Sequence, residues 1–93
     1  MEKKLGELSN FIIGKWQIIG HPFYVYEFDG GKCILPPGGT KLNYNVENMN
    51  GIPHIRTFDD LNYHWGDFGL TYINNDTLEL TQNMKLTRLV RVS

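Results

Sequence analysis

The chain contains no alanine among its 93 residues. Alanine is the strongest helix former, and its place is taken by residue types that suit a pleated sheet, with eight Ile, four Val, six Thr and twelve aromatic residues. Ten glycines and four prolines add the turn residues that short strands require. The composition therefore argues strongly against an all-helical protein and favours an all-β domain.

Apolar runs separated by turn residues recur along the chain at roughly ten-residue spacing. Residues 2–10 can form a short helical turn, and Asp29-Gly30-Gly31 is typical of a tight hairpin. After a turn at Gln82-Asn83, alternation places Met84, Leu86, Arg88, Val90 and Val92 on one face of the last strand. Pro53 allows a bulge, so either face of segment 52–58 can point inward. The expected strands cover residues 14–19, 23–28, 32–35, 41–46, 52–58, 63–65, 68–72, 78–81 and 84–92.

Eight or nine short strands of this kind are typical of an up-and-down barrel or a sandwich, and closure removes the exposed strand edges. We expect residues 1–93 to form a single domain, because a chain of this length holds one core. The predicted fold is a small antiparallel up-and-down β-barrel of about eight strands with a short N-terminal helical turn.

Two motifs at opposite ends of the chain suggest a family. Gly14-Lys15-Trp16 opens the first strand, and Arg88 lies on the otherwise apolar face of the last one. The pairing resembles the lipocalins and related calycin barrels, in which an arginine from the last strand packs against the tryptophan and closes the barrel. A guanidinium on a tryptophan face gains ~0.5–2 kcal/mol from the cation–π interaction. The resemblance implies that Gly14, Trp16 and Arg88 close the barrel.

More specifically, the chain is similar to the short bacterial lipocalin-like domains. The similarity rests on the aromatic strand and hairpin of residues 26–31, on the segment 72–80, and on Leu86-Thr87-Arg88. Full-length lipocalins are much longer and carry disulfides and a secretion signal, so a large ligand cavity is not expected here.

Charge and cysteine content limit the classes of partner and the compartment. Nine Lys and Arg against ten Asp and Glu give a formal charge of −1, without the basic excess that nucleic-acid binding usually requires. The single cysteine, Cys33, forms no internal disulfide, so a cytoplasmic location is expected. The apolar run Phe11-Ile12-Ile13 is too short for a signal core or a membrane span.

The residues needed for common catalytic sites are missing or badly spaced. Ser9 and Ser93 are the only serines, and neither lies in a nucleophile-elbow motif. The histidines His21, His54 and His64 fit no metal motif, and the closest ligand-like pair is His64 with Asp67. We therefore expect no catalytic residues, no metal and no cofactor. If the three histidines met at one point in the fold, an enzyme or a metal site would again be a candidate.

The leading hypothesis is a non-catalytic, lipocalin-like binding domain for a small apolar or amphipathic ligand. Tyrosines combine apolar area with a hydroxyl, and an arginine can face an anionic group. The candidate lining or rim residues are Tyr24, Tyr26, Tyr44, His54, Arg56 and Tyr72.

The alternative is a cytosolic protein-interaction module, such as an inhibitor or immunity-type antagonist from a phage or mobile element. Between Arg56 and Lys85 the chain carries five acids and no Lys or Arg, which would offer an acidic face to a basic partner. The candidate interaction residues are Asp59, Asp60, Asp67, Asp76 and Glu79.

Overall fold

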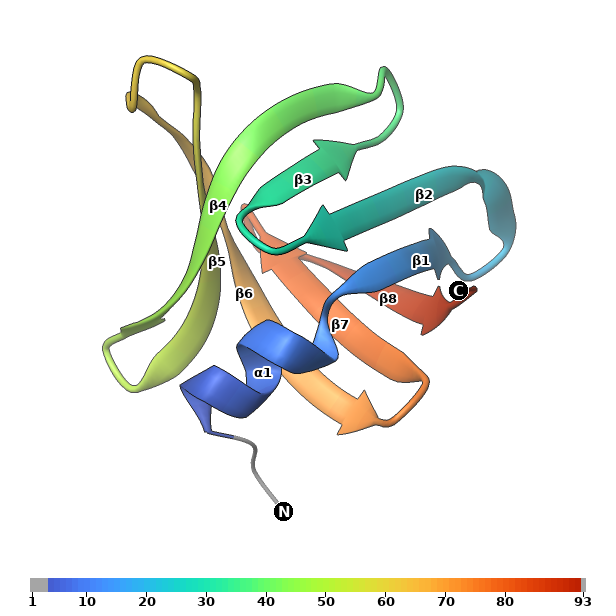
Figure 1. Cartoon of the computed structure of the whole chain (residues 1–93). Coiled ribbons are helices and arrows are strands. Elements are labelled where there is room, and N and C mark those ends of the chain that lie inside the picture. Colours follow the sequence, from blue (N-terminus) through green and yellow to red (C-terminus); the bar gives the residue numbers. More distant parts are fainter. Residues whose placement is uncertain (1–3, 93) are drawn as a thin grey trace.

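The computed structural model describes residues 4–92 as a closed antiparallel barrel with one short helix (Figure 1). Each strand pairs with the next along the chain, and the last strand pairs with the first. The fold class expected from the sequence is confirmed. The elements are α1 (Leu5–Phe11), β1 (Gly14–Ile18), β2 (His21–Asp29), β3 (Lys32–Leu35), β4 (Thr40–Met49), β5 (Ile52–Phe58), β6 (His64–Asn74), β7 (Thr77–Gln82) and β8 (Lys85–Arg91).

Most strands end within three residues of the expected bounds, and the helix and β6 differ in further respects. The helix begins at Leu5 and ends at Phe11, and residues 2 and 3 of the expected turn lie outside the described part of the chain. Segments 63–65 and 68–72, expected as two strands, form the single strand β6. Gly66 lies inside that strand and pairs with Thr57. A glycine read as a turn signal is therefore accommodated within a continuous strand.

The two ends of the barrel are built differently. The turns at residues 30–31, 50–51 and 75–76 lie at the end covered by α1, which we call the helix end. The turns at 19–20, 36–39 and 83–84 and the loop 59–63 surround the opposite end, which we call the mouth. The interior between them is filled by large apolar side chains, so the barrel is solid through most of its length. The buried apolar residues are Leu8, Ile12, Trp16, Phe28, Cys33, Leu35, Leu42, Tyr44, Ile55, Phe68, Leu70, Leu78, Leu80 and Leu89.

Trp16 and Arg91 close the helix end. The indole Nε1–H of the buried Trp16 donates to the backbone oxygen of Ile12 at 2.8 Å. The Arg91 guanidinium lies 4.3 Å from the centroid of the Trp16 ring and donates to the carbonyls of Phe11 at 2.6 Å and Ile13 at 3.0 Å. Gly14 has a φ of 132°, a conformation that favours glycine, where the chain leaves the helix and enters β1. The last strand is thereby tied to the backbone that follows α1.

The arginine expected in this position was Arg88, and that expectation is wrong. Arg88 lies on the outer surface, where its Nη2 is 2.6 Å from Oε2 of Glu79. The turn consists of Asn83 and Met84, both at positive φ, so that Gln82 pairs with Lys85. The expectation assigned the faces of this strand from its own apolar residues, whereas its pairing with β7 sets Leu89 beside Leu78 and Thr87 beside Leu80 and so turns the odd-numbered residues inward. Arg91 shares the inner face with Leu89, while Leu86 and Arg88 point outward.

No helix within residues 4–92 is long and apolar enough to cross a membrane.

Candidate functional site

A hollow of about 240 Å³ opens at the mouth of the barrel. Its walls come from five strands and from the turn that joins β3 to β4, so residues far apart in sequence meet there. Most of the lining is apolar or aromatic, with a small number of polar groups among it, which is the usual composition of a small-molecule site. The lining residues are Ile18, Tyr24, Tyr26, Pro36, Pro37, Phe68, Leu80, Gln82, Lys85 and Thr87.

The polar wall of this hollow comes from β7 and β8. Gln82 pairs with Lys85 and Leu80 pairs with Thr87, which places all four on the inner face of the barrel. Gln82 is held by a long hydrogen bond of 3.4 Å from its Nε2 to the backbone oxygen of Asp67. The final strand therefore turns polar residues inward at the mouth, while Leu86 faces solvent. Such an inversion of the usual pattern is expected at functional sites rather than in a plain core.

Tyr26 and Phe68 meet at the base of the hollow, with ring centroids 6.4 Å apart in an edge-to-face arrangement. Burial raises the pKa of Tyr26, so its hydroxyl stays protonated at neutral pH. Within residues 4–92 this hydroxyl has no hydrogen-bond partner. It is therefore a neutral polar group available to a molecule that enters the mouth.

Two of the six expected lining residues, Tyr24 and Tyr26, meet at the mouth, and the other two tyrosines lie elsewhere. Tyr44 is buried in the core, where its ring packs edge-on against Phe28 with centroids 5.4 Å apart. Tyr72 lies at the helix end, where its ring contacts Phe11 at 5.0 Å and its hydroxyl donates to Asn75 Oδ1 at 2.9 Å. These two tyrosines fill space inside the barrel, because the inner face of a small barrel takes large side chains.

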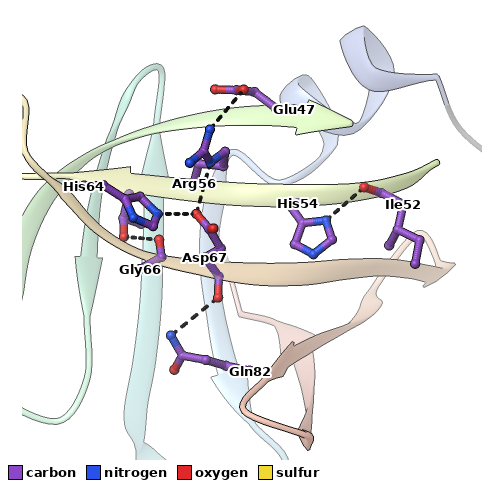
Figure 2. Close-up of polar contacts among 9 residues, drawn as sticks. Glu47, Ile52, His54, Arg56, His64, Gly66, Asp67 and Gln82 are labelled. Carbon is purple, nitrogen blue, oxygen red and sulfur yellow. Dashed lines mark hydrogen bonds and ion pairs between the residues drawn. The ribbon is translucent and has the colours of Figure 1, made fainter. Parts of the chain in front are cut away.

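His54 and Arg56, the remaining lining candidates, lie on the outer face of β5. Ile55 and Thr57 take the inner positions and are fully buried, which settles the parity that Pro53 left open. Figure 2 shows Arg56 between two carboxylates, with Asp67 Oδ1 3.2 Å from its Nε and Glu47 Oε1 3.7 Å from its Nη1.

His64 completes this outer cluster, with its Nε2 2.7 Å from Asp67 Oδ1 (Figure 2). His54 stands apart, and its Nδ1 lies 2.9 Å from the backbone oxygen of Ile52. Burial raises the pKa of Asp67, but hydrogen bonds and charges from His64 and Arg56 outweigh it, so that pKa lies below its ordinary value of 3.8. The charged groups of this cluster are therefore paired with one another on the outer surface of the barrel.

The depressed pKa of Asp67 predicts an acid-dependent loss of stability. Its contribution is fully present above the unfolded-state pKa, near 3.8, and is lost as the pH falls through the lower folded-state pKa. We expect Asp67→Asn to lower the free energy of unfolding by about 0.5–1.5 kcal/mol at pH 6, with the difference from wild type shrinking toward pH 2. Urea unfolding measured across this range checks the result.

Asp60→Asn is the matched control, because the Asp60 carboxylate accepts only one long hydrogen bond, of 3.5 Å, from Asn43. Its pH profile should follow that of wild type. A difference between Asp67→Asn and wild type that stayed constant down to pH 2 would contradict the assignment.

The five acids between Arg56 and Lys85 do not form one acidic face. Asp59 and Asp60 lie in the loop at the mouth, whereas Asp76 lies in the turn at the helix end, because β6 runs the length of the barrel between them. Asp67 and Glu79 are each paired with an arginine on the outer wall. The five acidic residues that are close in sequence are therefore separated in the fold. Three lie at the two ends of the barrel, and two form ion pairs on its outer wall.

The surroundings of Cys33 and of the histidines bear on nucleophilic and metal chemistry. Burial raises the pKa of the Cys33 thiol to about 11, only partly offset by a backbone hydrogen bond with Leu42, so the thiol stays protonated at neutral pH. His21 stacks on Tyr24 at 5.7 Å, away from the pairing of His64 with Asp67. In the described part of the chain, no three His, Cys, Asp or Glu side chains are grouped to hold a metal ion.

Exposed apolar side chains surround the mouth. Phe23, beside the 19–20 turn, is 92% exposed, and Met84, in the 83–84 turn, is 100% exposed. Leu61, Tyr63 and Trp65 project at the loop 59–63, which the Asp59 carboxylate holds by accepting hydrogen bonds from the backbone N–H groups of Leu61 and Tyr63. The exposed aromatic residues of the described chain, Phe23, Tyr24, Tyr63 and Trp65, all lie at this end.

Two further hollows lie outside the barrel and are less suited to an amphipathic ligand. One, of about 440 Å³, lies between α1 and the turn at residues 30–31 and is lined mainly by small and polar residues. The other, of about 320 Å³, lies on the outer face of β2–β4 among charged side chains that include Glu27, Lys32 and Lys41. Apolar and aromatic residues make up most of the lining at the mouth and a minority of the lining in the two other hollows.

Sequence reasoning identified Tyr24 and Tyr26 but missed the polar wall formed by Gln82, Lys85 and Thr87. Any two-residue turn pairs the even-numbered residues of β7 with odd-numbered residues of β8, so extending the inner face of Leu78 and Leu80 through the turn would have placed these three inward. Comparison of the chain with protein-family models, with curated proteins and with solved structures finds no match.

Proposed function

We propose that this protein is a non-catalytic, lipocalin-like binding domain that takes a small amphipathic molecule at the mouth of its barrel. The observation that carries the proposal is the hollow itself, in which an aromatic base meets a polar wall. Tyr26 and Phe68 supply the apolar base, and Gln82 and Thr87 supply hydrogen-bonding groups beside it. The lone cysteine is unpaired, which is in keeping with a protein of the reducing cytoplasm.

The size of the hollow limits the ligand. At about 240 Å³ it exceeds the ~150 Å³ that holds benzene in an engineered protein cavity, and it falls short of the ~300 Å³ at which drug-sized pockets begin. The ligand is therefore a single ring or a short chain with one polar end. A molecule of this size binds weakly, with a dissociation constant of about 0.1–10 mM.

An NMR titration with 3-phenylpropan-1-ol tests the proposal. We expect saturable shifts of the backbone amides of Ile18, Tyr26 and Thr87, because these residues line the hollow. Thr87→Phe fills the hollow with a ring of its own and should weaken binding by about tenfold or more, since about 1.4 kcal/mol of lost contact corresponds to a factor of ten.

Thr71→Phe is the matched control, because Thr71 is exposed on β6 outside the hollow. This variant should bind the alcohol like wild type. Shifts confined to other surfaces, or equal binding by Thr87→Phe and Thr71→Phe, would contradict the proposal.

A second candidate function, a protein-interaction module, is favoured by the exposed apolar side chains around the mouth. Phe23, Met84 and the apolar residues of the loop 59–63 are exposed at the same end of the barrel, and exposed apolar side chains that gather into a patch mark interaction surfaces. Native mass spectrometry of the protein purified from its own host distinguishes the two candidates. A retained small molecule supports the ligand site, and a retained protein partner supports the interaction module.

A further inference from the structure

We infer that the molecule bound at the mouth is an anion, and that Lys85 is its counter-ion. The inference rests on the proposed function and narrows it from small amphipathic molecules in general to those with a carboxylate or a similar acidic end.

The first observation is the placement of Lys85. Two cationic residues of β8 lie on the inward-facing side of the strand: Arg91, half-buried at the helix end, and Lys85, exposed at the rim of the mouth. Arg91 is satisfied by the carbonyls of Phe11 and Ile13 and by the Trp16 ring. No hydrogen bond or ion pair joins the Lys85 side chain to another residue in the described part of the chain. Arg91 thus closes the helix end of the barrel, and Lys85 is available to bind a ligand at the mouth.

The second observation is the charge balance of the hollow. Among the lining residues within 4–92, Lys85 is the only charged side chain, and none is Asp or Glu. The ion pairs among residues 4–92 do not include Lys85. Asp59 in the mouth loop accepts hydrogen bonds from the backbone of that loop, and Asp60 lines the outer hollow. The acidic cluster around Asp67 faces the outside of β6 and is already paired with His64 and Arg56. A negative group of a ligand is therefore the missing partner.

The third observation is the arrangement of the neutral polar groups. The Tyr26 hydroxyl is protonated and unpartnered, and it lies in the same hollow as the ammonium group of Lys85. Both are hydrogen-bond donors, and a carboxylate accepts from both while a cationic group accepts from neither. The aromatic rings of Tyr24, Tyr26 and Phe68 then surround the apolar part of the ligand.

The test compares three probes that share a phenylpropyl group: 3-phenylpropanoate, 3-phenylpropan-1-ol and 3-phenylpropan-1-amine. We expect wild-type protein to bind the acid about three- to tenfold more tightly than the alcohol, and to bind the protonated amine most weakly. Lys85→Met keeps the length of the side chain and removes the charge. It should remove the preference for the acid, so that acid and alcohol bind to this variant with similar affinity.

Lys41→Met is the matched control, because Lys41 is exposed near the mouth but lines the outer hollow instead. The preference for the acid should survive in this variant, and in wild type it should fall as salt is raised from ~0.05 to ~0.5 M. Equal affinities of wild type for acid and alcohol, or a preference that persists in Lys85→Met, would overturn the inference and leave the proposed function standing. Absence of mouth shifts with every probe would overturn both.

Discussion

Replacement of Trp16 by alanine is expected to lower the free energy of unfolding by about 3–5 kcal/mol. The Trp16 side chain is fully buried at the helix end, so its removal leaves a cavity between Phe11 and the Arg91 guanidinium. Its Nε1–H donates to the Ile12 carbonyl, which then loses a partner. Small domains are stable by ~5–15 kcal/mol, so this loss takes up a large share of the total. Urea unfolding followed by circular dichroism measures it.

The other tryptophan provides the control. Trp65 is 53% exposed at the mouth, and Trp65→Ala should change the free energy of unfolding by less than about 0.5 kcal/mol. If Trp16→Ala does not fold, Trp16→Phe keeps most of the ring and removes the N–H donor, at an expected cost of about 1–2 kcal/mol. A larger loss in Trp65→Ala than in the Trp16 variants would show that the helix end does not hold the barrel together.

Replacement of Arg91 by methionine should lower the free energy of unfolding by about 2–4 kcal/mol. Arg91 connects β8 to the Phe11 and Ile13 carbonyls through two charged hydrogen bonds and also stacks on Trp16. Methionine retains part of the packing against the rings but leaves both carbonyls without this donor. The measurement is again urea unfolding, with hydrogen exchange at Leu8 and Ile12 as a local report on α1.

Arg88→Met discriminates between the two arginines. The Arg88 side chain is 54% exposed in its pair with Glu79, so its loss should cost no more than about 1 kcal/mol. The free energy of unfolding of Arg91→Lys should lie between those of wild type and Arg91→Met. The ammonium group keeps the positive charge but lacks the planar guanidinium that donates to both carbonyls. If Arg88→Met lowered the free energy of unfolding more than Arg91→Met does, barrel closure would have to be assigned to Arg88.

Most of the barrel was predictable from local sequence signals. The absence of alanine, the glycine hairpin at 29–31 and the alternation of Leu42, Tyr44 and Val46 each specify strands without reference to distant residues. Gly14 and Trp16 were placed correctly, because their roles depend on the step from helix to strand. The division of β6 into two strands was wrong, because Gly66 resembles a turn residue when its partner Thr57 is not known.

The inward-facing residues of the last strand could not be identified from the sequence of that strand alone. Leu86, Val90 and Val92 form an apolar alternation that favours the inner face, yet Leu86 is exposed and Leu89 is fully buried. The inner positions are fixed by the pairing of Leu78 with Leu89 and of Leu80 with Thr87, which is tertiary information. Lys85 and Thr87 were missed at the site for the same reason, whereas Tyr24 and Tyr26 were found because β2 alternates in the usual sense.

The pairing of β1 with β8 also determines when the protein can fold during its own synthesis. Every other pairing in the barrel joins strands that are neighbours along the chain, but Trp16 meets Arg91 across nearly its full length. The sheet cannot close until residue 91 has left the ribosome, which at ~5–20 residues per second follows the emergence of β1 by several seconds. During that interval the nascent chain presents two unpaired strand edges. Until β8 pairs with β1, these edges are open to pairing with a strand of another chain.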